Sequence, residues 1–327
     1  MPDAIVLRGL TKTFGDTVAV RDFDLAVPQG ALYGVIGPNG AGKTTTIRMV
    51  LSILLPDRGE LSVLGHRSAM EAKDRIGYLP EERGLYKRMR VGQFLSYMAH
   101  LKHADGADLR SRIRTWLERV ELGGAENKRC EELSKGMQQK VQFLAAIVHR
   151  PDLLILDEPF SGLDPINQRL LRELVDEEHR RGATVLFSTH VMSLAEQLCD
   201  HVVMIHRGEK VLDDEIGAIR ARYDPRDIWF EPLDPAADVG ALARLDGVDR
   251  VRKDGSSWDI TLAPAASPGA VIQRVAAAIP PARVELRRPS LEDVFIRIVR
   301  AGTAEGDDAM LRAAVRDGGD GRGELRP

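Results

Sequence analysis

The sequence has no long apolar run. No stretch approaches the roughly 18–20 apolar residues that a membrane-spanning helix requires. The first residues, Met1–Leu7, also lack a basic segment followed by a long apolar stretch, so we expect no signal peptide. Both absences argue against a chain that itself crosses a membrane.

An excess of basic charge is also missing. Lysine and arginine together number 46, aspartate and glutamate 49, and the formal net charge is −3. A near-neutral chain offers no electrostatic attraction to phosphate backbones, so we expect no nucleic acid partner. Cysteine is scarce, and Cys130 and Cys199 are typical of free thiols in a cytosolic protein rather than of a disulfide bridge.

What the chain does contain is the composition of a globular protein with room for two domains. It has 327 residues, of which 43% are hydrophobic and 29% charged. Through the first two thirds, apolar strand patterns alternate with helical ones, which predicts a mostly parallel sheet. The expected strands are Ala4–Leu10, Asp22–Val27, Ala31–Gly37, Leu153–Leu156, Ala183–Ser188 and His201–Ile205. The expected helices are Lys43–Leu54, 92–122, Lys135–His149, 167–181 and 192–199. This α/β domain is predicted to span residues 1–218, with a helical insertion at about 85–150.

A second pattern begins after a break near Arg220–Pro225. Residues 226–300 read as strand, helix, strand, strand, helix and strand, followed by a last helix at Leu291–Val299; this order is that of a ferredoxin-like α+β unit. The last helix is preceded by Ser290, and Asp293 stands at the spacing of a capping box. Residues 301–327 are rich in Gly, Asp, Glu and Arg, and we predict that they are mostly disordered.

A glycine-rich segment links an expected strand to an expected helix. Gly37–Thr44 fits the pattern G-x-x-x-x-G-K-S/T, in which backbone N–H groups and a helix N-terminus face phosphate oxygens. In such a loop Lys43 reaches the β- and γ-phosphates, and Thr44 binds Mg²⁺. An ordinary glycine turn is the alternative, but the strand before and the helix after favour the phosphate loop. The predicted ATP-binding residues here are Gly37, Pro38, Asn39, Gly40, Ala41, Gly42, Lys43, Thr44 and Thr45.

An acidic pair follows a second apolar strand. Leu153–Leu156 ends in Asp157 and Glu158. A carboxylate at such a strand end can hold Mg²⁺ beside the phosphate loop, which is the role expected of Asp157. Glu158 is then placed to act as the general base that polarises the attacking water.

These motifs together resemble the ATP-binding subunits of ABC transporters. Five segments stand in the order seen in that family, and the resemblance covers about residues 4–215. The segments are Gly37–Thr44, Leu133–Gln138, Leu153–Pro159, Ser161–Asp164 and Ser188–His190. The remainder resembles the C-terminal extension of bacterial drug or sodium-type exporter subunits, and Leu291–Ile296 is typical of its end. The resemblance implies a P-loop ABC ATPase domain followed by the small α+β domain.

The resemblance also implies roles for residues outside the two phosphate motifs. The signature segment, Ser134, Lys135, Gly136 and Met137, would contact the γ-phosphate of ATP held by a second subunit. His190 would be the switch histidine that bonds the γ-phosphate, and Asp164 would belong to the loop at the dimer interface. Phe14 would stack on adenine.

Two departures from the family pattern stand out. The common signature is LSGGQ, and Lys135 and Met137 replace its third and fifth residues. The glutamine of the lid loop is replaced by Glu81, which keeps an oxygen for Mg²⁺ but cannot donate as an amide does. We therefore include Glu81 with Thr44 and Asp157 as an expected metal ligand.

The implied function is ATP hydrolysis that powers a separate integral membrane permease. Two copies would sandwich two ATP molecules as a homodimer, peripheral on the cytoplasmic face of the membrane, with 81–94 near the permease. Export follows from the resemblance of the C-terminal part. One alternative is a soluble ABC ATPase that acts on ribosomes or DNA, against which the single cassette and the short 45–133 interval argue. Another is a regulatory nucleotide-binding module without turnover, against which Glu158 and His190 argue.

Overall fold

The structure, a computed structural model, describes residues 2–82, 84–222 and 226–302. It divides into two compact units, one ending at Glu215 and one spanning Ile216–Gly302. The segment predicted to be disordered, 301–327, lies outside the described residues except for its first two. None of the helices in the described part of the chain combines the length and the apolar character that crossing a membrane takes.

A sheet of six strands forms the centre of the first unit, in the order β5-β6-β7-β3-β8-β9. Its strands are β3 (Leu32–Ile36), β5 (Ile76–Leu79), β6 (Leu153–Asp157), β7 (Thr184–Thr189), β8 (His201–His206) and β9 (Glu209–Glu215). All neighbours pair in parallel except β8 and β9. The predicted parallel sheet is confirmed, and β3, β6 and β7 are fully buried, as expected of the mainly apolar strands of a parallel sheet.

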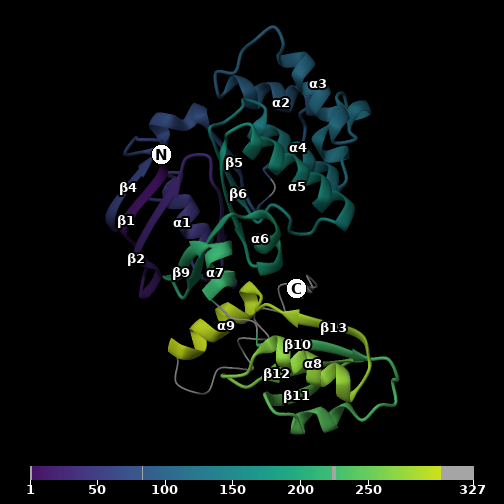
Figure 1. Ribbon diagram of the computed structural model, residues 1–327. Coiled ribbons are helices and arrows are strands. Elements are labelled where there is room, and N and C mark those ends of the chain that lie inside the picture. The colour runs from purple at the N-terminus through teal and green to yellow at the C-terminus, as the bar shows by residue number, and fades with distance from the viewer. Residues whose placement is uncertain (1, 83, 223–225, 303–327) are drawn as a thin grey trace, which may run out of the picture. The chain divides into compact units, whose positions relative to one another are not determined.

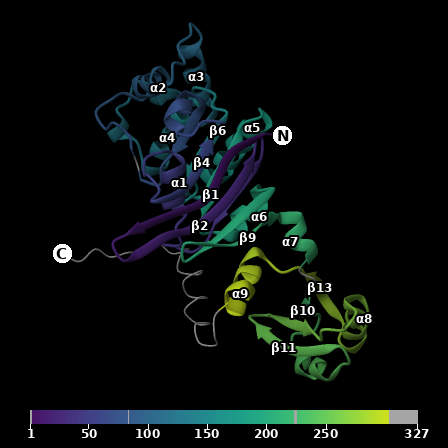
Figure 2. The same ribbon diagram turned by 90° about the vertical axis from the view of Figure 1, so that its left-hand side faces the viewer.

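A second, antiparallel sheet of three strands has the order β2-β1-β4. Its strands are β1 (Asp3–Phe14), β2 (Thr17–Pro28) and β4 (Arg58–Val63). Ile5 and Leu7 on β1 point into the core that this sheet shares with α1 (Lys43–Val50) and the six-stranded sheet. Figure 2 shows β1, β2 and β4 as a layer of their own.

Helices cover the six-stranded sheet and form the insertion. They are α2 (Val91–His100), α3 (Leu109–Arg119), α4 (Lys135–Ile147), α5 (Pro165–Arg180) and α6 (Met192–Leu198), with short 3-10 turns at Ala69–Arg75, Gly123–Ala125 and Cys130–Glu132. Residues 85–150 contribute helices and none of the strands, and α2 packs against both α3 and α4 at one end of the unit (Figure 1).

Two helix predictions were wrong in extent. The helix predicted over Lys43–Leu54 ends at Val50, because Ser52 has a left-handed φ of 55° that a helix cannot contain. The single helix predicted over 92–122 is two helices, α2 and α3. His103, with φ of 53°, lies in the turn between them, so it does not share a helix with His100.

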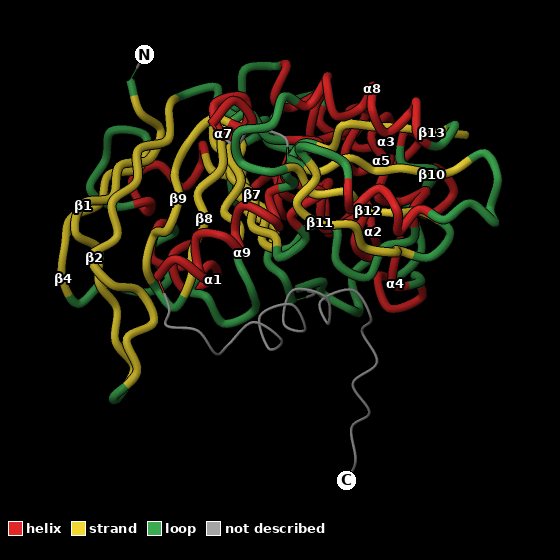
Figure 3. The backbone as a smooth tube through the Cα atoms, turned by 60° about the horizontal axis from the view of Figure 1, so that its bottom comes forward, coloured by secondary structure: helices red, strands yellow, loops and turns green. Residues whose placement is uncertain are grey.

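The second unit begins with α7 (Ile216–Arg222) and contains a four-stranded antiparallel sheet in the order β11-β12-β10-β13. Its elements are β10 (Asp227–Pro232), β11 (Val248–Asp254), β12 (Ser257–Leu262), α8 (Pro268–Ala278), β13 (Pro281–Arg287) and α9 (Leu291–Gly302). Figure 3 marks its strands in yellow and α8 in red. The strand order is that of a ferredoxin-like unit, but the first of its predicted helices, expected over Ala237–Leu245, is a 3-10 helix over Val239–Arg244.

Alternation along β10 builds the core of this unit. Ile228 and Phe230 point inward to Val271 and Val275 of α8, while Trp229 faces away from that core. Because successive strand residues point to opposite faces, one face of the sheet is apolar and covered by α8.

Candidate active site

Three neighbouring strands of the six-stranded sheet carry the predicted site residues at their carboxyl ends. β3 leads into the glycine-rich loop and α1, β6 ends at Asp157, and β7 ends just before His190. Because β6, β7 and β3 are parallel neighbours, these three ends meet at one edge of the sheet. That is where ligands bind in open α/β sheets.

The glycines of the loop are required by its backbone. Gly37 has φ of 156°, and a Cβ there would lie 2.2 Å from the carbonyl oxygen of Ile205. Gly42 has φ of 111°, and its Cβ would lie 2.5 Å from the carbonyl oxygen of Ala19. Any side chain at these positions would collide with backbone, so the loop keeps its tight curve only with glycine.

Lys43 is buried inside this loop, with 6% of its side chain exposed. Its ammonium group donates to the carbonyl oxygens of Gly37 at 2.8 Å and Pro38 at 3.2 Å. Burial lowers the pKa of Lys43, and the carboxylate of Glu158 opposes this shift. The loop therefore encloses a positive charge whose hydrogen bonds go to its own backbone.

Asp157 is almost fully buried, with 1% exposed. One oxygen, Oδ1, accepts from the hydroxyls of Ser188 at 2.5 Å and Thr44 at 3.3 Å. The other, Oδ2, is buried and has no hydrogen-bond partner within the described residues. Burial raises the pKa of Asp157, while the bonds from Ser188 and Thr44 lower it.

Glu158 is held between two basic groups. Its Oε1 lies 3.0 Å from Nδ1 of His190 and 3.7 Å from Nζ of Lys43. Its backbone has a left-handed φ of 48°, and its N–H donates to the hydroxyl of Ser188 at 3.1 Å. The structure thus brings Lys43, Thr44, Asp157, Glu158 and His190 together.

Glu81 follows the adjacent strand β5 and belongs to the same electrostatic environment. Burial raises the pKa of its carboxyl group, and the negative charges of Asp157 and Glu158 raise it further. The charges of the acidic pair therefore act on Glu81.

The signature segment lies at a helix start. Ser134 is the N-cap of α4, and its hydroxyl accepts from the N–H of Met137 at 3.3 Å. Asp164 caps α5 in the same way, accepting from the N–H of Asn167 at 2.9 Å. A Cβ on Gly136 would lie 3.4 Å from Nδ2 of Asn167, so the two helix starts are adjacent.

Two predicted groups stand apart from the Lys43 cluster. In the described part of the chain, Ser134, Lys135, Gly136 and Met137 make no hydrogen bond or ion pair with Lys43, Asp157 or Glu158. Phe14, at the end of β1, is 50% exposed, and the ammonium of Lys12 lies 5.6 Å from its ring centroid.

Comparison with known proteins decides the family. Residues 20–161 match the family model of the ABC transporter, and residues 215–299 match that of the ATP-binding protein DrrA1-3-like C-terminal domain. The chain is 39% identical to the uncharacterized ABC transporter ATP-binding protein YhaQ of Bacillus subtilis, over 91% of this chain and 99% of that protein.

The chain belongs to the ABC transporter ATP-binding proteins.

Other relatives agree with this membership. The chain is 32% identical to the daunorubicin resistance ATP-binding protein DrrA3 of Streptomyces coeruleorubidus, over 95% of this chain and 99% of that protein. A solved ATP-binding subunit of an ABC transporter superposes with a TM-score of 0.63 at 31% identity, over 67% of this chain and 93% of that one.

As an ABC transporter ATP-binding protein, the chain is an ATP-hydrolysing subunit. The predicted family, fold class and enzyme class are confirmed. The comparisons support transport over the alternative of an ATPase that acts on ribosomes or DNA.

The ABC ATP-binding unit also contains contacts that the motifs did not predict. The segment Ser188–His190 predicts no separate role for Ser188, yet its hydroxyl bonds both Asp157 and the backbone of Glu158. Gln139 and Gln142 on α4 reach the loops after β6 and β5. The position of Ser188 at the carboxyl end of a buried strand was the one local signal for its role.

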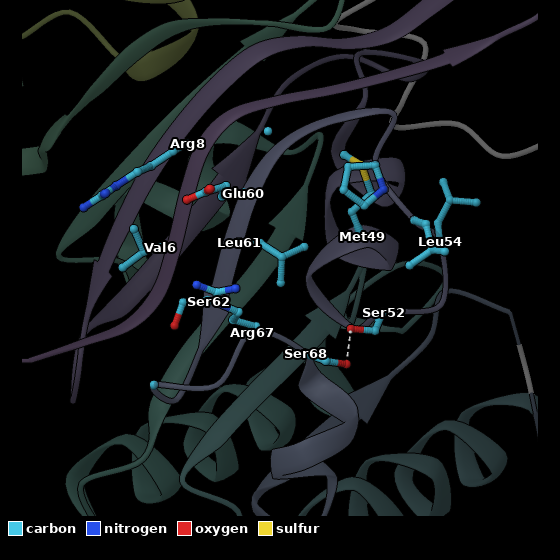
Figure 4. Close-up of a pocket in the computed structure, with 14 residues that line it drawn as sticks. Val6, Arg8, Met49, Ser52, Leu54, Glu60, Leu61, Ser62, Arg67 and Ser68 are labelled. Carbon is cyan, nitrogen blue, oxygen red and sulfur yellow. Dashed lines mark hydrogen bonds between the residues drawn. The ribbon is translucent and has the colours of Figure 1, made fainter.

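A separate pocket of about 590 Å³ lies between the antiparallel sheet and the end of α1. Figure 4 shows Arg8, Glu60 and Arg67 around it, and the hydrogen bond of 3.2 Å between the hydroxyls of Ser52 and Ser68. None of its lining residues is a predicted site residue.

Proposed function

We propose that this chain binds Mg-ATP through residues 37–45 and hydrolyses it with Glu158 as general base. The observation that carries the proposal is the convergence of Lys43, Thr44, Asp157 and Glu158 at one edge of the sheet. One buried cation, one hydroxyl and two carboxylates are the groups that phosphoryl transfer requires.

The residues present fit a divalent cation. Oδ2 of Asp157 is buried without a hydrogen-bond partner in the described chain, beside the hydroxyl of Thr44. A buried carboxylate oxygen without a partner is costly unless a cation or water completes it. Thr44, Asp157 and Glu81 would hold Mg²⁺, which neutralises charge on the β- and γ-phosphates when bound.

The contacts of Lys43 and Glu158 describe a resting site. The Lys43 ammonium bonds loop carbonyls, and phosphate oxygens are stronger acceptors, so ATP would draw it away from Gly37 and Pro38. Glu158 would then be free to accept a proton from water, with His190 beside it to orient the γ-phosphate.

The remaining predicted residues complete this site from a second copy. We propose a homodimer in which Ser134, Lys135, Gly136 and Met137 of one chain contact the ATP held by the other, with Asp164 at the interface. The first N–H groups of α4, which begins after the Ser134 cap, point out of the helix start and are suited to a phosphate. Phe14 would stack on adenine with its exposed ring.

We further propose that the subunit powers a separate integral membrane permease from the cytoplasmic face, and that transport is outward. Export is supported by relatives named for daunorubicin resistance and Nod factor export. The match of residues 215–299 to the DrrA1-3-like C-terminal domain supports the same class.

The test replaces the general base. Glu158→Gln keeps the side-chain shape but cannot take a proton, so phosphate release should fall about 10²–10⁴-fold. Binding of a fluorescent ATP analogue should persist. Glu173→Gln, an exposed glutamate on α5, is the matched control and should behave as wild type. Near-normal turnover of Glu158→Gln would remove Glu158 from this role.

A further inference from the structure

Helix α4 connects the signature segment to two catalytic loops of its own chain. It begins at Lys135, directly after the Ser134 cap, and packs against β5. Gln139 and Gln142 are three positions apart, so they lie on the same face of this helix. Both side chains reach backbone carbonyls outside α4.

Gln139 holds the loop that follows Glu158. Its Nε2 donates to the carbonyl oxygen of Pro159 at 2.7 Å, one residue beyond the general base. The other end of this loop is held from α5, where Nε2 of Gln168 donates to the carbonyl oxygens of Phe160 at 3.4 Å and Leu163 at 3.1 Å. The loop between Glu158 and Asp164 is therefore tied to both helices.

Gln142 reaches the loop that follows Glu81. Its side chain is 7% exposed, and its Nε2 lies 3.4 Å from the carbonyl oxygen of Glu82. A Cβ on Gly84 would lie 4.0 Å from the same amide nitrogen, which places the amide against this loop. A buried amide without its acceptor would lose free energy, so the contact restrains both partners.

We propose that Gln139 and Gln142 are positioning residues through which the signature segment sets the places of Glu158 and Glu81. The strands β5 and β6 are parallel neighbours, so their two loops leave the sheet side by side. One rigid helix bonded to both must move them together when its N-terminus moves. The inference rests on the proposed function, because it assumes that Glu158 is the base and that the signature contacts ATP.

A purely structural role would show a different pattern. Loss of packing lowers stability and reduces the fraction of folded enzyme, so the measured activity falls only in proportion to that fraction. Loss of positioning lowers kcat per folded molecule while ATP affinity stays, because a misplaced base leaves ground-state binding intact.

The experiment compares three variants of the full chain. Gln139→Met and Gln142→Met keep side-chain length and remove the donor. Lys140→Met is the matched control, because Lys140 lies on the same helix and donates to the carbonyl of Val120 at 3.1 Å, within the helical insertion. We expect kcat of Gln139→Met to fall about tenfold or more, with binding of a non-hydrolysable ATP analogue within about twofold of wild type. Gln142→Met should shift the Mg²⁺ concentration at half-maximal turnover, and Lys140→Met should change neither quantity.

A pH profile provides the readout that packing cannot move. A protonated carboxylic acid can donate to the Pro159 carbonyl, and an ionised one cannot. The ratio of kcat in Gln139→Glu to kcat in Gln139→Met should therefore rise as the pH falls. Because the kcat ratio is followed over a range of pH, its trend can still be measured if one of the two variants folds poorly at a single pH.

Three outcomes separate the possibilities. If Gln139→Met and Lys140→Met lose activity equally and in proportion to stability, or if the ratio is flat with pH, the positioning role is wrong. If wild-type turnover does not depend on Glu158, the proposed function fails instead. The expected pattern, with Glu158→Gln inactive and only the glutamine variants shifted, supports both.

Discussion

Ser188 joins the two acidic residues of the site through one hydroxyl group. It donates to Oδ1 of Asp157 at 2.5 Å and accepts from the N–H of Glu158 at 3.1 Å. Glu158 has a left-handed backbone with φ of 48°, which is unfavourable for a residue with a side chain. The bonds of Ser188 help to hold this conformation, which turns the Glu158 side chain toward Lys43 and His190.

His149 provides a pH prediction at the same scale. Its Nε2 donates to the carbonyl oxygen of Ile76 at 3.2 Å, while its Nδ1 is buried without a partner in the described residues. Burial lowers the pKa of His149 to about 4, and the charge of Lys102 adds to this effect. The unfolded chain, with a pKa near 6.5, binds the proton first, so stability falls as the pH drops from about 6.5 to about 4.

We expect the free energy of unfolding to lose up to about 3 kcal/mol over this window from His149. His149→Gln keeps a donor for Ile76 and does not titrate, so its stability should decline less. Urea unfolding at pH 7.5, 6 and 4.5 measures the difference. Parallel declines in the two proteins would show that other groups cause the acid sensitivity.

Glu81 gives a prediction about the metal. Its carboxylate shares the environment of Asp157 and Glu158. Glu81→Gln removes one negative charge, and roughly 1 kcal/mol of lost attraction to Mg²⁺ corresponds to about a fivefold higher half-saturating concentration. ATP binding should remain. Magnesium titration of ATPase activity makes the measurement, with the neighbouring Glu82→Gln as control. Titrations of wild type and Glu81→Gln that superimpose would place Glu81 away from the metal.

At the scale of elements, the start of α9 shows a capping box that the sequence predicts. The capping-box spacing of Ser290 and Asp293 predicted a reciprocal pair, and the pair forms. The N–H of Ser290 donates to Oδ2 of Asp293 at 2.9 Å, and the N–H of Asp293 donates to Oγ of Ser290 at 3.2 Å. Ser267, at the start of α8, makes no such cap bond.

This contrast supplies a matched test of α9. Ser290→Ala removes the cap and should destabilise the start of the helix by about 1 kcal/mol. Amide hydrogen exchange in 291–299 should then become about fivefold faster. Ser267→Ala has no cap bond to lose, so exchange in α8 should stay unchanged. Equal protection of α9 in wild type and Ser290→Ala would show that the capping box contributes nothing there.

At the scale of the whole molecule, the proposed active site is shared between two chains, because within the described chain the signature makes no hydrogen bond or ion pair with Lys43, Asp157 or Glu158. The prediction uses two inactive variants, Lys43→Ala and Ser134→Arg. In a mixed dimer with shared sites, one site holds both defects and the other holds none. ATPase activity should therefore return in part when the two proteins are mixed.

Two controls make this mixing experiment decisive. Mass measurement of the mixture must show that mixed dimers form. The second control is a dimer of one wild-type chain and one chain that carries both Lys43→Ala and Ser134→Arg. If sites are shared, each site of this dimer has one defect and it should be inactive. If each site lies within one chain, the wild-type site is intact and its ATPase activity shows that a single site can turn over. If mixed dimers form and no activity returns, while a single intact site is shown to turn over, the shared arrangement is refuted.

The sequence by itself determined the parts that local patterns encode. Short apolar stretches predicted β3, β6 and the middle of β7, because a strand buried on both faces needs no polar alternation. The motif Gly37–Thr44 predicted its loop, because only glycine tolerates those φ angles. Strand and helix order predicted the ferredoxin-like topology of the second unit, which the sheet order confirms.

Only the tertiary structure decided the rest, because long-range pairing outweighs local preference there. β4 is half exposed and β9 reads Glu-Lys-Val-Leu-Asp-Asp-Glu, so neither has a strand pattern; each forms by pairing with β1 or β8. Gln139 and Gln142 belong to no motif, and the segment Ser188–His190 assigns a role to His190 but none to Ser188; the partners of all three lie 20 to 60 residues away in sequence. Their contacts exist because the parallel sheet brings the ends of β5, β6 and β7 to one edge, and no local pattern records which residues will meet there.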